Sequence, residues 1–269
     1  MKIAIIKVFT LIVLVSVLSA CQTSSNTTTN AIGSQGSPMS REEFDRHKAA
    51  QTRLSAGLQY LQNGSLLNAK RHLDKALELG ADSPNVHFGL AYYYEQVKEF
   101  EKAEKSYKKA LRIAPKNPDF LNGYGSFLCA KGEYEEAEEY FNKAIDQPTY
   151  ADIESAFMNA GVCAKRANNR DKAAGYFRKA LNRNSKLPVA LIEMAEVEFY
   201  KKRYERAFNY IQRFEAVSRP TANSLWLGLR VAHHRKDKDA RASYAIKLEQ
   251  LFPDSDQTAE YLDNKKQWM

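Results

Sequence analysis

The stretch AEKSYKKA at residues 103–110 decides the architecture of this chain, because it recurs as AEEYFNKA at 137–144 and as AAGYFRKA at 173–180. In each copy alanine is followed by an aromatic residue four positions later and by a second alanine three positions after that. The first two copies begin 34 residues apart, and Ala69 lies 34 residues before the first of them. Self-similarity at this period predicts a stack of helix pairs, an architecture that binds partners rather than catalyses.

The period and the signature resemble those of tetratricopeptide repeats. That resemblance implies an all-α fold, a right-handed superhelix of about six helix-turn-helix repeats closed by a polar capping helix. A spacing of 36 residues between the second and third copies puts two extra residues in the connection 147–150, which we expect to lie outside the packed helix faces. The predicted repeats are residues 50–83, 84–117, 118–151, 154–187, 188–221 and 221–254, and the predicted cap is 255–269.

The chemistry of the repeat signature is steric. Small residues at the eighth and twentieth positions of a repeat let its two helices approach closely, and the aromatic residue at position 24 fills space between neighbouring repeats. We therefore assign these positions to the core and not to a functional site.

The amino terminus has the pattern of a secretory signal. Lys2 and Lys7 flank an apolar run that is short for a membrane span and ends in Leu-Ser-Ala-Cys at residues 18–21. These four residues resemble a bacterial lipobox, which implies cleavage before Cys21 and covalent lipid on that cysteine. An ordinary signal peptide followed by an unrelated cysteine is the alternative. In the enterobacterial sorting pattern, aspartate directly after the lipidated cysteine retains a lipoprotein in the inner membrane. This chain has Gln22 there, and by that resemblance we expect it at the periplasmic face of the outer membrane.

This pattern divides the chain into a signal peptide (1–20), a lipidated tether (21–40) and a repeat domain (41–269). The tether consists mostly of Ser, Thr, Asn, Gly and Gln, with almost nothing to bury, so we expect a flexible coil with a reach on the order of 25 Å. Ser40 and Glu43 have the spacing of a capping box, which predicts that the first helix begins directly after the serine.

In tetratricopeptide proteins the first helix of each repeat lines the concave wall, and by that resemblance five of its positions are exposed. In the first two repeats these positions form a groove more apolar than solubility requires, and such patches mark partner-binding surfaces. The side chains at these positions of the third repeat are small and polar enough to admit a partner's backbone. We therefore expect the partner to bind as an extended peptide or an amphipathic helix across repeats one to three. A groove covered by the chain's own amino-terminal helix is the alternative. The predicted groove residues are Leu54, Leu58, Leu61, Phe88, Tyr92, Glu95, Asn122 and Ser126, and Gln51, Gln62, Asn85, Gln96, Asp119, Cys129 and Ala130 occupy the remaining exposed positions.

Two cysteines, Cys129 and Cys163, remain once Cys21 is acylated. Secretion would place them in an oxidising compartment, and helices of adjacent repeats can bring two Cα atoms within about 7 Å. We expect a disulfide between them, and two buried thiols one repeat apart are the alternative. No metal site is expected here, because no histidine or closely spaced cysteine motif is near.

The formal net charge of +8 permits acidic partners, but basic residues alternate with glutamate along 99–109 and 133–143. Such alternation is typical of solvated helix faces with i, i+4 ion pairs, and we expect no nucleic-acid partner. No nucleotide-binding, metalloprotease or serine-hydrolase motif occurs, and the His233-His234 pair is expected to be a solvated helix end. We therefore predict no enzyme activity and no cofactor besides the covalent lipid on Cys21.

A narrower resemblance lies in the third and fourth repeats. NPDFLNGYGSFLC at 117–129, Pro148-x-Tyr150 and NAGVC at 159–163 resemble the type IV pilus biogenesis and stability lipoproteins. The similarity covers the lipobox and most of residues 41–250, while the last repeats match loosely. It implies a lipidated outer-membrane pilotin that binds subunits of the secretin, the ring through which the pilus leaves the cell, and helps them localise and multimerise. We expect the chain to act as a monomer that contacts the membrane through its lipid.

Two other classes of function fit the same anchor and helices. A lipoprotein scaffold or activator of a periplasmic cell-wall synthase would co-purify with that enzyme, and its loss would alter envelope growth rather than piliation. A periplasmic hydrolase would need a cleft with coupled carboxylates, which the sequence does not predict.

Overall fold

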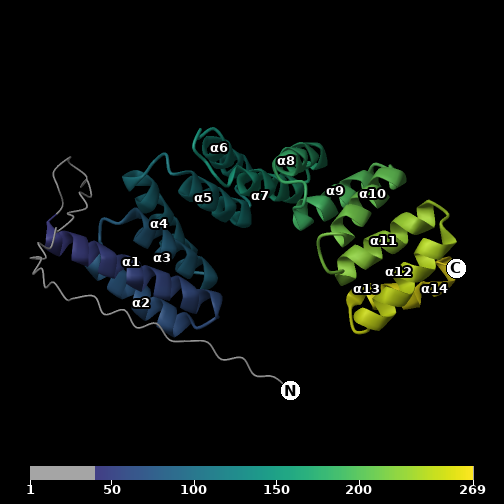
Figure 1. Ribbon diagram of the computed structural model, residues 1–269, viewed down its shortest axis with the longest axis horizontal. Coiled ribbons are helices and arrows are strands. Elements are labelled where there is room, and N and C mark those ends of the chain that lie inside the picture. The colour runs from purple at the N-terminus through teal and green to yellow at the C-terminus, as the bar shows by residue number, and fades with distance from the viewer. Residues whose placement is uncertain (1–39, 269) are drawn as a thin grey trace, which may run out of the picture. The chain divides into compact units, whose positions relative to one another are not determined.

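The computed structural model describes residues 40–268, in which every regular element is a helix (Figure 1). The predicted signal peptide, Cys21 and the tether up to residue 39 lie outside the described residues. No helix in the described range is long and apolar enough to cross a membrane. The helices are α1 (Arg41–Gln62), α2 (Leu66–Leu79), α3 (Pro84–Gln96), α4 (Phe100–Ile113), α5 (Pro118–Lys131), α6 (Tyr134–Ile145), α7 (Ile153–Arg166), α8 (Arg170–Arg183), α9 (Pro188–Tyr200), α10 (Tyr204–Glu215), α11 (Ala222–His234), α12 (Lys238–Leu251), α13 (Asp256–Asp263) and α14 (Lys265–Trp268).

The described residues fall into two units, 40–44 and 45–268. In the first unit Ser40 and Glu43 form the expected capping box: the Ser40 N–H donates to Glu43 Oε2 at 2.9 Å, and the Glu43 N–H donates to Ser40 Oγ at 3.2 Å. These bonds satisfy N–H groups that have no partner within the helix. Residues 41–49 are the beginning of α1, one continuous helix.

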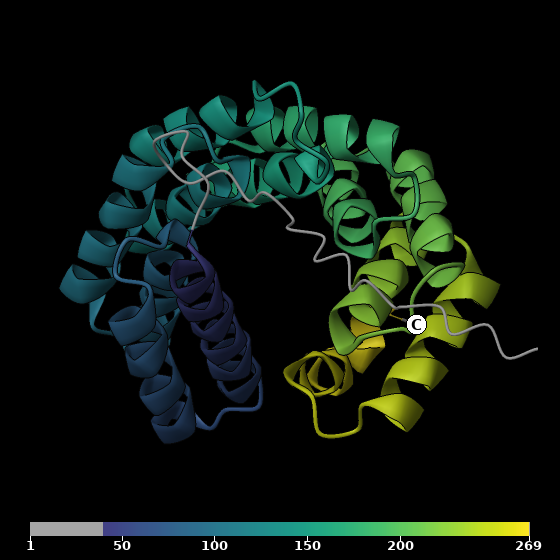
Figure 2. The same ribbon diagram turned by 60° about the vertical axis from the view of Figure 1, so that its left-hand side comes forward.

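In the second unit the helices pack in pairs, α3 with α4, α5 with α6, α7 with α8, α9 with α10 and α11 with α12. Successive pairs lie side by side in a curved stack, with the first helix of each pair on the inner side and the second on the outer side (Figure 2). Each pair contacts mainly its neighbours along the chain, as in other solenoids. The expected all-α tetratricopeptide solenoid is confirmed.

The repeat signature forms a close contact inside each hairpin. Gly161 of α7 faces Phe177 of α8 so closely that a Cβ on the glycine would lie 2.5 Å from the ring Cε1. The large residue also reaches the next repeat, because the Tyr107 ring centroid lies 5.2 Å from that of Phe127 in α5. Position 24 therefore joins the two helices of its own repeat to the repeat that follows. Equivalent small and large residues meet at Gly57 and Leu73, Gly125 and Phe141, and Gly228 and Tyr244.

The turn between the two helices of each repeat contains one residue with a left-handed backbone. In two repeats this residue is glycine, at Gly64 (φ 72°) and Gly132 (φ 87°). In the others it carries a side chain, which in this region costs on the order of 1 kcal/mol. The same turn recurs because it folds the second helix of the pair back onto the first. The four residues with side chains are Lys98, Asn168, Lys202 and Lys236, with φ between 58° and 60°.

The longer connection at 147–150 is exposed at Pro148 and Thr149, as expected, but its last residue, Tyr150, belongs to the core. Tyr150 is 9% exposed and packs in a cluster with Leu121 and Ala144. Its hydroxyl accepts a hydrogen bond from Asn122 Nδ2 at 3.2 Å. The longer connection thus places an aromatic ring against α5 and α6.

The alternating charges of the outer helices form ion pairs along the helix, as expected. Lys108 Nζ lies 2.6 Å from Glu104 Oε1, and Lys143 Nζ lies 3.7 Å from Glu139 Oε2. Lys131 Nζ, 2.8 Å from Glu104 Oε2, links neighbouring repeats. Exposed pairs of this kind contribute about 0.3 to 0.5 kcal/mol each, so they solvate the surface more than they stabilise the fold.

The carboxyl-terminal segment forms two short helices, α13 and α14, where one capping helix is expected. Trp268 of α14 packs against Trp226 and His233 of α11, with ring centroids 5.1 and 5.0 Å apart. His234 stacks on Tyr204 at 4.5 Å. Both histidines therefore take part in ring packing. Within residues 40–268 no group of three His, Cys, Asp or Glu side chains is placed to hold a metal ion.

Candidate partner-binding groove

Helices α1 and α3 form a groove at the place where the sequence predicts one. Its cavity volume is about 600 Å³. The walls combine leucine and aromatic side chains with a few amides, which suits an apolar segment whose backbone needs some hydrogen-bond partners. Apart from Gly89, every lining residue stands at a position predicted to be exposed on the concave wall. The lining residues are Leu54, Leu58, Leu61, Gln62, Asn85, Phe88, Gly89, Tyr92 and Gln96.

The α1 side of the groove is a stripe of leucines. Leu54, Leu58 and Leu61 follow one another at i, i+4 and i+7, so they share one face of the helix. Leu58 and Leu61 are half-buried, but Leu54 is only 7% exposed and packs in the core with Leu73. Leu54 thus forms the floor of the groove. The expectation that its side chain is exposed is wrong. The reason is the close approach of α3, where a Cβ on Gly89 would lie 2.5 Å from Leu54 Cδ1.

The α3 side of the groove is aromatic. Phe88 and Tyr92 pack edge to face with ring centroids 4.9 Å apart. Tyr92 is 39% exposed, whereas the Phe88 ring reaches α5, where it lies 4.7 Å from the ring of Phe120. Glycine at position 123 leaves room for it, since a Cβ there would lie 2.5 Å from Phe88 Cζ. Phe88 therefore fixes the groove wall against the third repeat.

A carboxylate lies next to this aromatic wall. The Tyr107 hydroxyl donates to Glu95 Oε2 at 2.9 Å, and the Tyr107 ring centroid is 6.2 Å from that of Tyr92. Burial raises the pKa of Glu95, and the hydrogen bond from Tyr107 offsets only part of this effect. Burial, followed by the charges of Glu95 and Asp119, raises the pKa of Tyr92. The two carboxylates therefore act on the same tyrosine that lines the groove.

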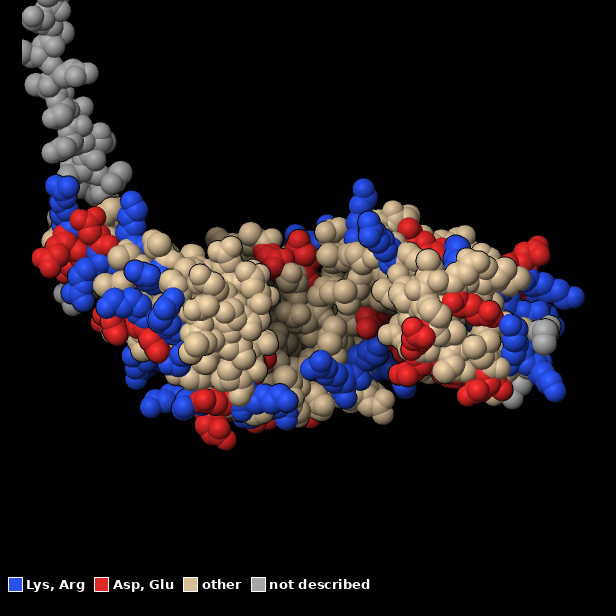
Figure 3. Space-filling model, turned by 90° about the horizontal axis from the view of Figure 1, so that it is seen from below, with Lys and Arg blue, Asp and Glu red and all other residues tan. Residues whose placement is uncertain are grey.

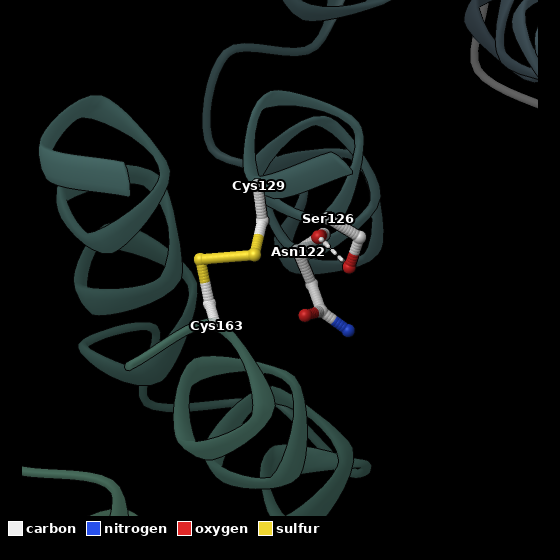
Figure 4. Close-up of a disulfide and its surroundings, with 4 residues drawn as sticks. All are labelled: Asn122, Ser126, Cys129 and Cys163. Atoms are coloured by element: carbon white, nitrogen blue, oxygen red, sulfur yellow. Dashed lines mark hydrogen bonds between the residues drawn. A yellow bond between two sulfur atoms is a disulfide. The ribbon is translucent and has the colours of Figure 1, made fainter. Parts of the chain in front are cut away.

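Asn122 and Ser126 do not line the groove. Asn122 was expected to face solvent, but it is buried. Asn122 is 9% exposed, its Nδ2 donates to the Tyr150 hydroxyl at 3.2 Å, and its Oδ1 accepts from Asn159 Nδ2 at 3.0 Å. Ser126 Oγ donates to the Asn122 carbonyl at 3.0 Å (Figure 4). Both side chains are already bonded within the chain, so we confine the groove to the first two repeats.

The structure contains a disulfide between Cys129 of α5 and Cys163 of α7 (Figure 4). The two Cα atoms are 5.7 Å apart, inside the range that a bridge spans, and both side chains are buried. The bond joins the first helices of adjacent repeats and closes a loop with a sequence separation of 34. Its formation in the cell stays a prediction.

We expect the double variant Cys129→Ser, Cys163→Ser to lower the free energy of unfolding by about 3 to 4 kcal/mol, because the bridge restricts the unfolded chain. Urea denaturation of the two proteins measures the difference. Alkylation without reductant, followed by mass measurement, should leave both cysteines of the wild-type protein unlabelled. Two labelled thiols would exclude the bond.

Charged side chains lie along the borders of the face shown in Figure 3 and also beside the hollow in its middle. The hollow in the middle of that face is lined largely by uncharged residues. Protein interfaces commonly have this composition, with few charges at the centre and a polar rim.

Both the sequence and the fold match known proteins. A family model described as YpiA-like, C-terminal tetratricopeptide repeats matches residues 84–148, and a tetratricopeptide-repeat model matches 125–188. The type IV pilus assembly protein PilF of Pseudomonas aeruginosa is 32% identical over 220 residues, which cover 82% of this chain and 87% of PilF. An uncharacterized protein of Haemophilus influenzae is 30% identical over 132 residues, covering 49% of this chain and 74% of that protein.

Solved structures give the same result. The structure of Pseudomonas aeruginosa PilF matches with a TM-score of 0.75 at 33% identity, covering 82% of this chain and 99% of that one. The type IV pilus biogenesis factor PilW matches with a TM-score of 0.73 at 25% identity, covering 79% of this chain and 98% of that one.

The stacked helix pairs and the apolar groove define a tetratricopeptide-repeat protein of the protein-binding class. Within that class, the chain belongs to the family of the type IV pilus assembly protein PilF. It is therefore a tetratricopeptide-repeat protein of type IV pilus biogenesis.

Proposed function

We propose that this protein is an outer-membrane lipoprotein that binds secretin subunits in the groove between α1 and α3 and promotes their localisation and multimerisation. The observation that carries the proposal is the groove, about 600 Å³ in volume and walled by leucine and aromatic side chains. The likeness to PilF, at 32% identity over 82% of the chain, supports the proposal by assigning the protein to the type IV pilus system.

A ring subunit before assembly has apolar surface that its neighbours in the ring later cover. A groove of leucine and aromatic side chains can cover one segment of that surface until a second subunit replaces it. Leu58 and Leu61 are half-buried in the free protein, so each has apolar surface left to bury against a partner. This surface supplies affinity without a large rearrangement of the groove.

The lipid on Cys21 supplies the membrane location in this proposal. Attachment by two or more acyl chains is stable, because each buried CH₂ contributes about 0.8 kcal/mol. Between Cys21 and the first helix the sequence has 19 residues, mostly Ser, Thr, Asn, Gly and Gln. In this proposal they link the lipid to the groove, and a chain of that length and composition would reach on the order of 25 Å, enough to clear the headgroups.

Loss of the lipid should separate binding from assembly. In the test variant, a signal that is cleaved without lipidation replaces residues 1–20, and serine replaces Cys21. We expect it to bind purified secretin subunits within about twofold of wild type, because the groove is unchanged, but to form far fewer secretin rings in the outer membrane. Membrane fractionation and counting of heat-resistant multimers measure both effects, with Ser24→Ala in the wild-type background as the control. Normal ring numbers in the unlipidated variant would contradict the anchoring role.

A further inference from the structure

Two carboxylates beside the groove have no cation of their own. Among the described residues, no Lys, Arg or His nitrogen lies within 4.0 Å of Glu95 or Asp119, and the one recorded side-chain partner of Glu95 is the Tyr107 hydroxyl at 2.9 Å. Glu95 is half-buried, so its charge has lost part of its water and received one neutral hydrogen bond in return. Such a group gains more from a cation than a fully solvated carboxylate does.

Three carboxylates of the inner helix α9 have a cationic partner within the chain. Glu193 and Glu196 of α9 share Lys165 of α7, whose Nζ lies 2.6 and 2.5 Å from their oxygens. Arg203 Nη1 lies 3.6 Å from Oε2 of Glu198, also on α9. Glu95 has no such partner, and it belongs to α3, the helix that supplies the aromatic wall of the groove.

An aromatic ring connects this charge to the groove. Tyr92 lines the groove and is 39% exposed, and the charges of Glu95 and Asp119 both act on its hydroxyl. Gln96, the neighbour of Glu95 in sequence, also lines the groove. A lysine or arginine over the Tyr92 ring would be attracted by the ring face and by the carboxylates together.

We propose that the segment of the secretin subunit held in this groove carries apolar side chains, which fill the leucine stripe, followed by a lysine or arginine. This cation pairs with Glu95 beside Tyr92, and the charge of Asp119 adds to the attraction. This inference rests on the proposed function and adds the chemistry of the bound segment. The apolar part supplies affinity, and the charge fixes the direction in which the segment lies.

The ionised carboxylate of Glu95 lowers the stability of the protein without its partner. Burial raises the pKa of Glu95 in the folded state, so folding favours the protonated acid, and that stability is lost as the pH rises through the folded-state pKa. Glu95→Gln removes the buried charge and keeps an oxygen that can accept from Tyr107. The variant should therefore fold with an unchanged or higher melting temperature at neutral pH while it binds less well.

The test measures binding of the full-length protein, purified in detergent, to the purified secretin subunit at low and high salt. We expect Glu95→Gln to weaken binding about tenfold and to flatten its salt dependence, with a smaller loss for Asp119→Asn, because Asp119 is exposed. Glu136→Gln, a matched change at an exposed position of α6, should bind as wild type does. Leu58→Asp is measured in parallel as the test of the groove itself.

The outcomes separate this inference from the proposed function. Loss of binding in Leu58→Asp with unchanged binding in Glu95→Gln would keep the groove and overturn the pairing with a cation. Unchanged binding in Leu58→Asp would overturn the groove as the secretin site, and the inference with it. Weaker binding by Glu95→Gln together with a lower melting temperature would assign Glu95 to fold stability and overturn the inference. The protein alone could also form dimers that the Glu95→Gln substitution dissociates. That result would place a second copy of the protein in the groove and would overturn the inference.

Discussion

Leu58→Asp is expected to weaken binding of the secretin subunit by a factor of about 100 or more. Leu58 is half-buried in the α1 wall, and covering the rest of a leucine side chain contributes up to about 2 kcal/mol. Aspartate forfeits that contribution and adds the desolvation of a carboxylate against the partner's apolar segment. A total near 3 kcal/mol corresponds to about a hundredfold in the dissociation constant. Titration of the purified secretin subunit with each protein measures the change.

Leu67 offers a matched control for this substitution. It is a leucine of the next helix, α2, it is 84% exposed, and it does not line the groove. Leu67→Asp introduces the same charge on a surface already in water, so we expect wild-type affinity and wild-type thermal stability. Equal loss of binding in both variants would mean that the added charge acts without regard to position, and wild-type binding by Leu58→Asp would move the site elsewhere.

Phe177→Ala is expected to lower the free energy of unfolding by about 3 to 5 kcal/mol. The ring is fully buried and fills the space over Gly161, so its removal combines lost apolar burial with a cavity that rigid helices cannot close. Urea denaturation followed by circular dichroism measures the loss. Because each repeat is held by its neighbours, we also expect the single transition to broaden or to split, as repeats on the two sides of α8 lose their coupling.

Phe100→Ala is the matched control for the core substitution. Phe100 stands at the start of α4 and is 43% exposed, so its removal should cost about 1 kcal/mol or less. Similar losses in the two variants would contradict the assignment of position 24 as the residue that holds neighbouring repeats together.

The fold could be predicted because its decisive contacts lie close together in sequence. The small residue and the large residue that meet across a hairpin, such as Gly161 and Phe177, are 16 positions apart in each repeat, so the pattern recurs along the chain. The groove could be predicted for the same reason, since a position within a repeat fixes the side of the helix on which a residue stands. Gly89 was missed, although a glycine inside a helix signals close packing, here against Leu54.

The rest depends on contacts that no local pattern encodes. The repeat position of Asn122 predicts an exposed amide, but the amide is bonded to Tyr150 and Asn159, which come 28 and 37 residues later. The buried position of Tyr150 could not be predicted either. The two extra residues of its connection indicate a longer loop, and nothing in their pattern indicates that the loop places an aromatic ring in the core. The left-handed residues Lys98, Lys202 and Lys236 could not be recognised either, because lysine has no preference for that backbone region and tertiary packing imposes it.

The central claim, that this protein assembles the secretin, is tested most directly by the state of the secretin in outer membranes of cells that lack the gene. Gel electrophoresis separates the heat-resistant multimer from the monomer, and complementation with the wild-type gene and with Leu58→Asp completes the experiment. We expect the multimer to disappear without the gene, to return with the wild-type protein and to stay absent with Leu58→Asp. A normal amount of multimer at its normal location in the deleted cells would contradict the account and direct the search to a cell-wall synthase as the partner.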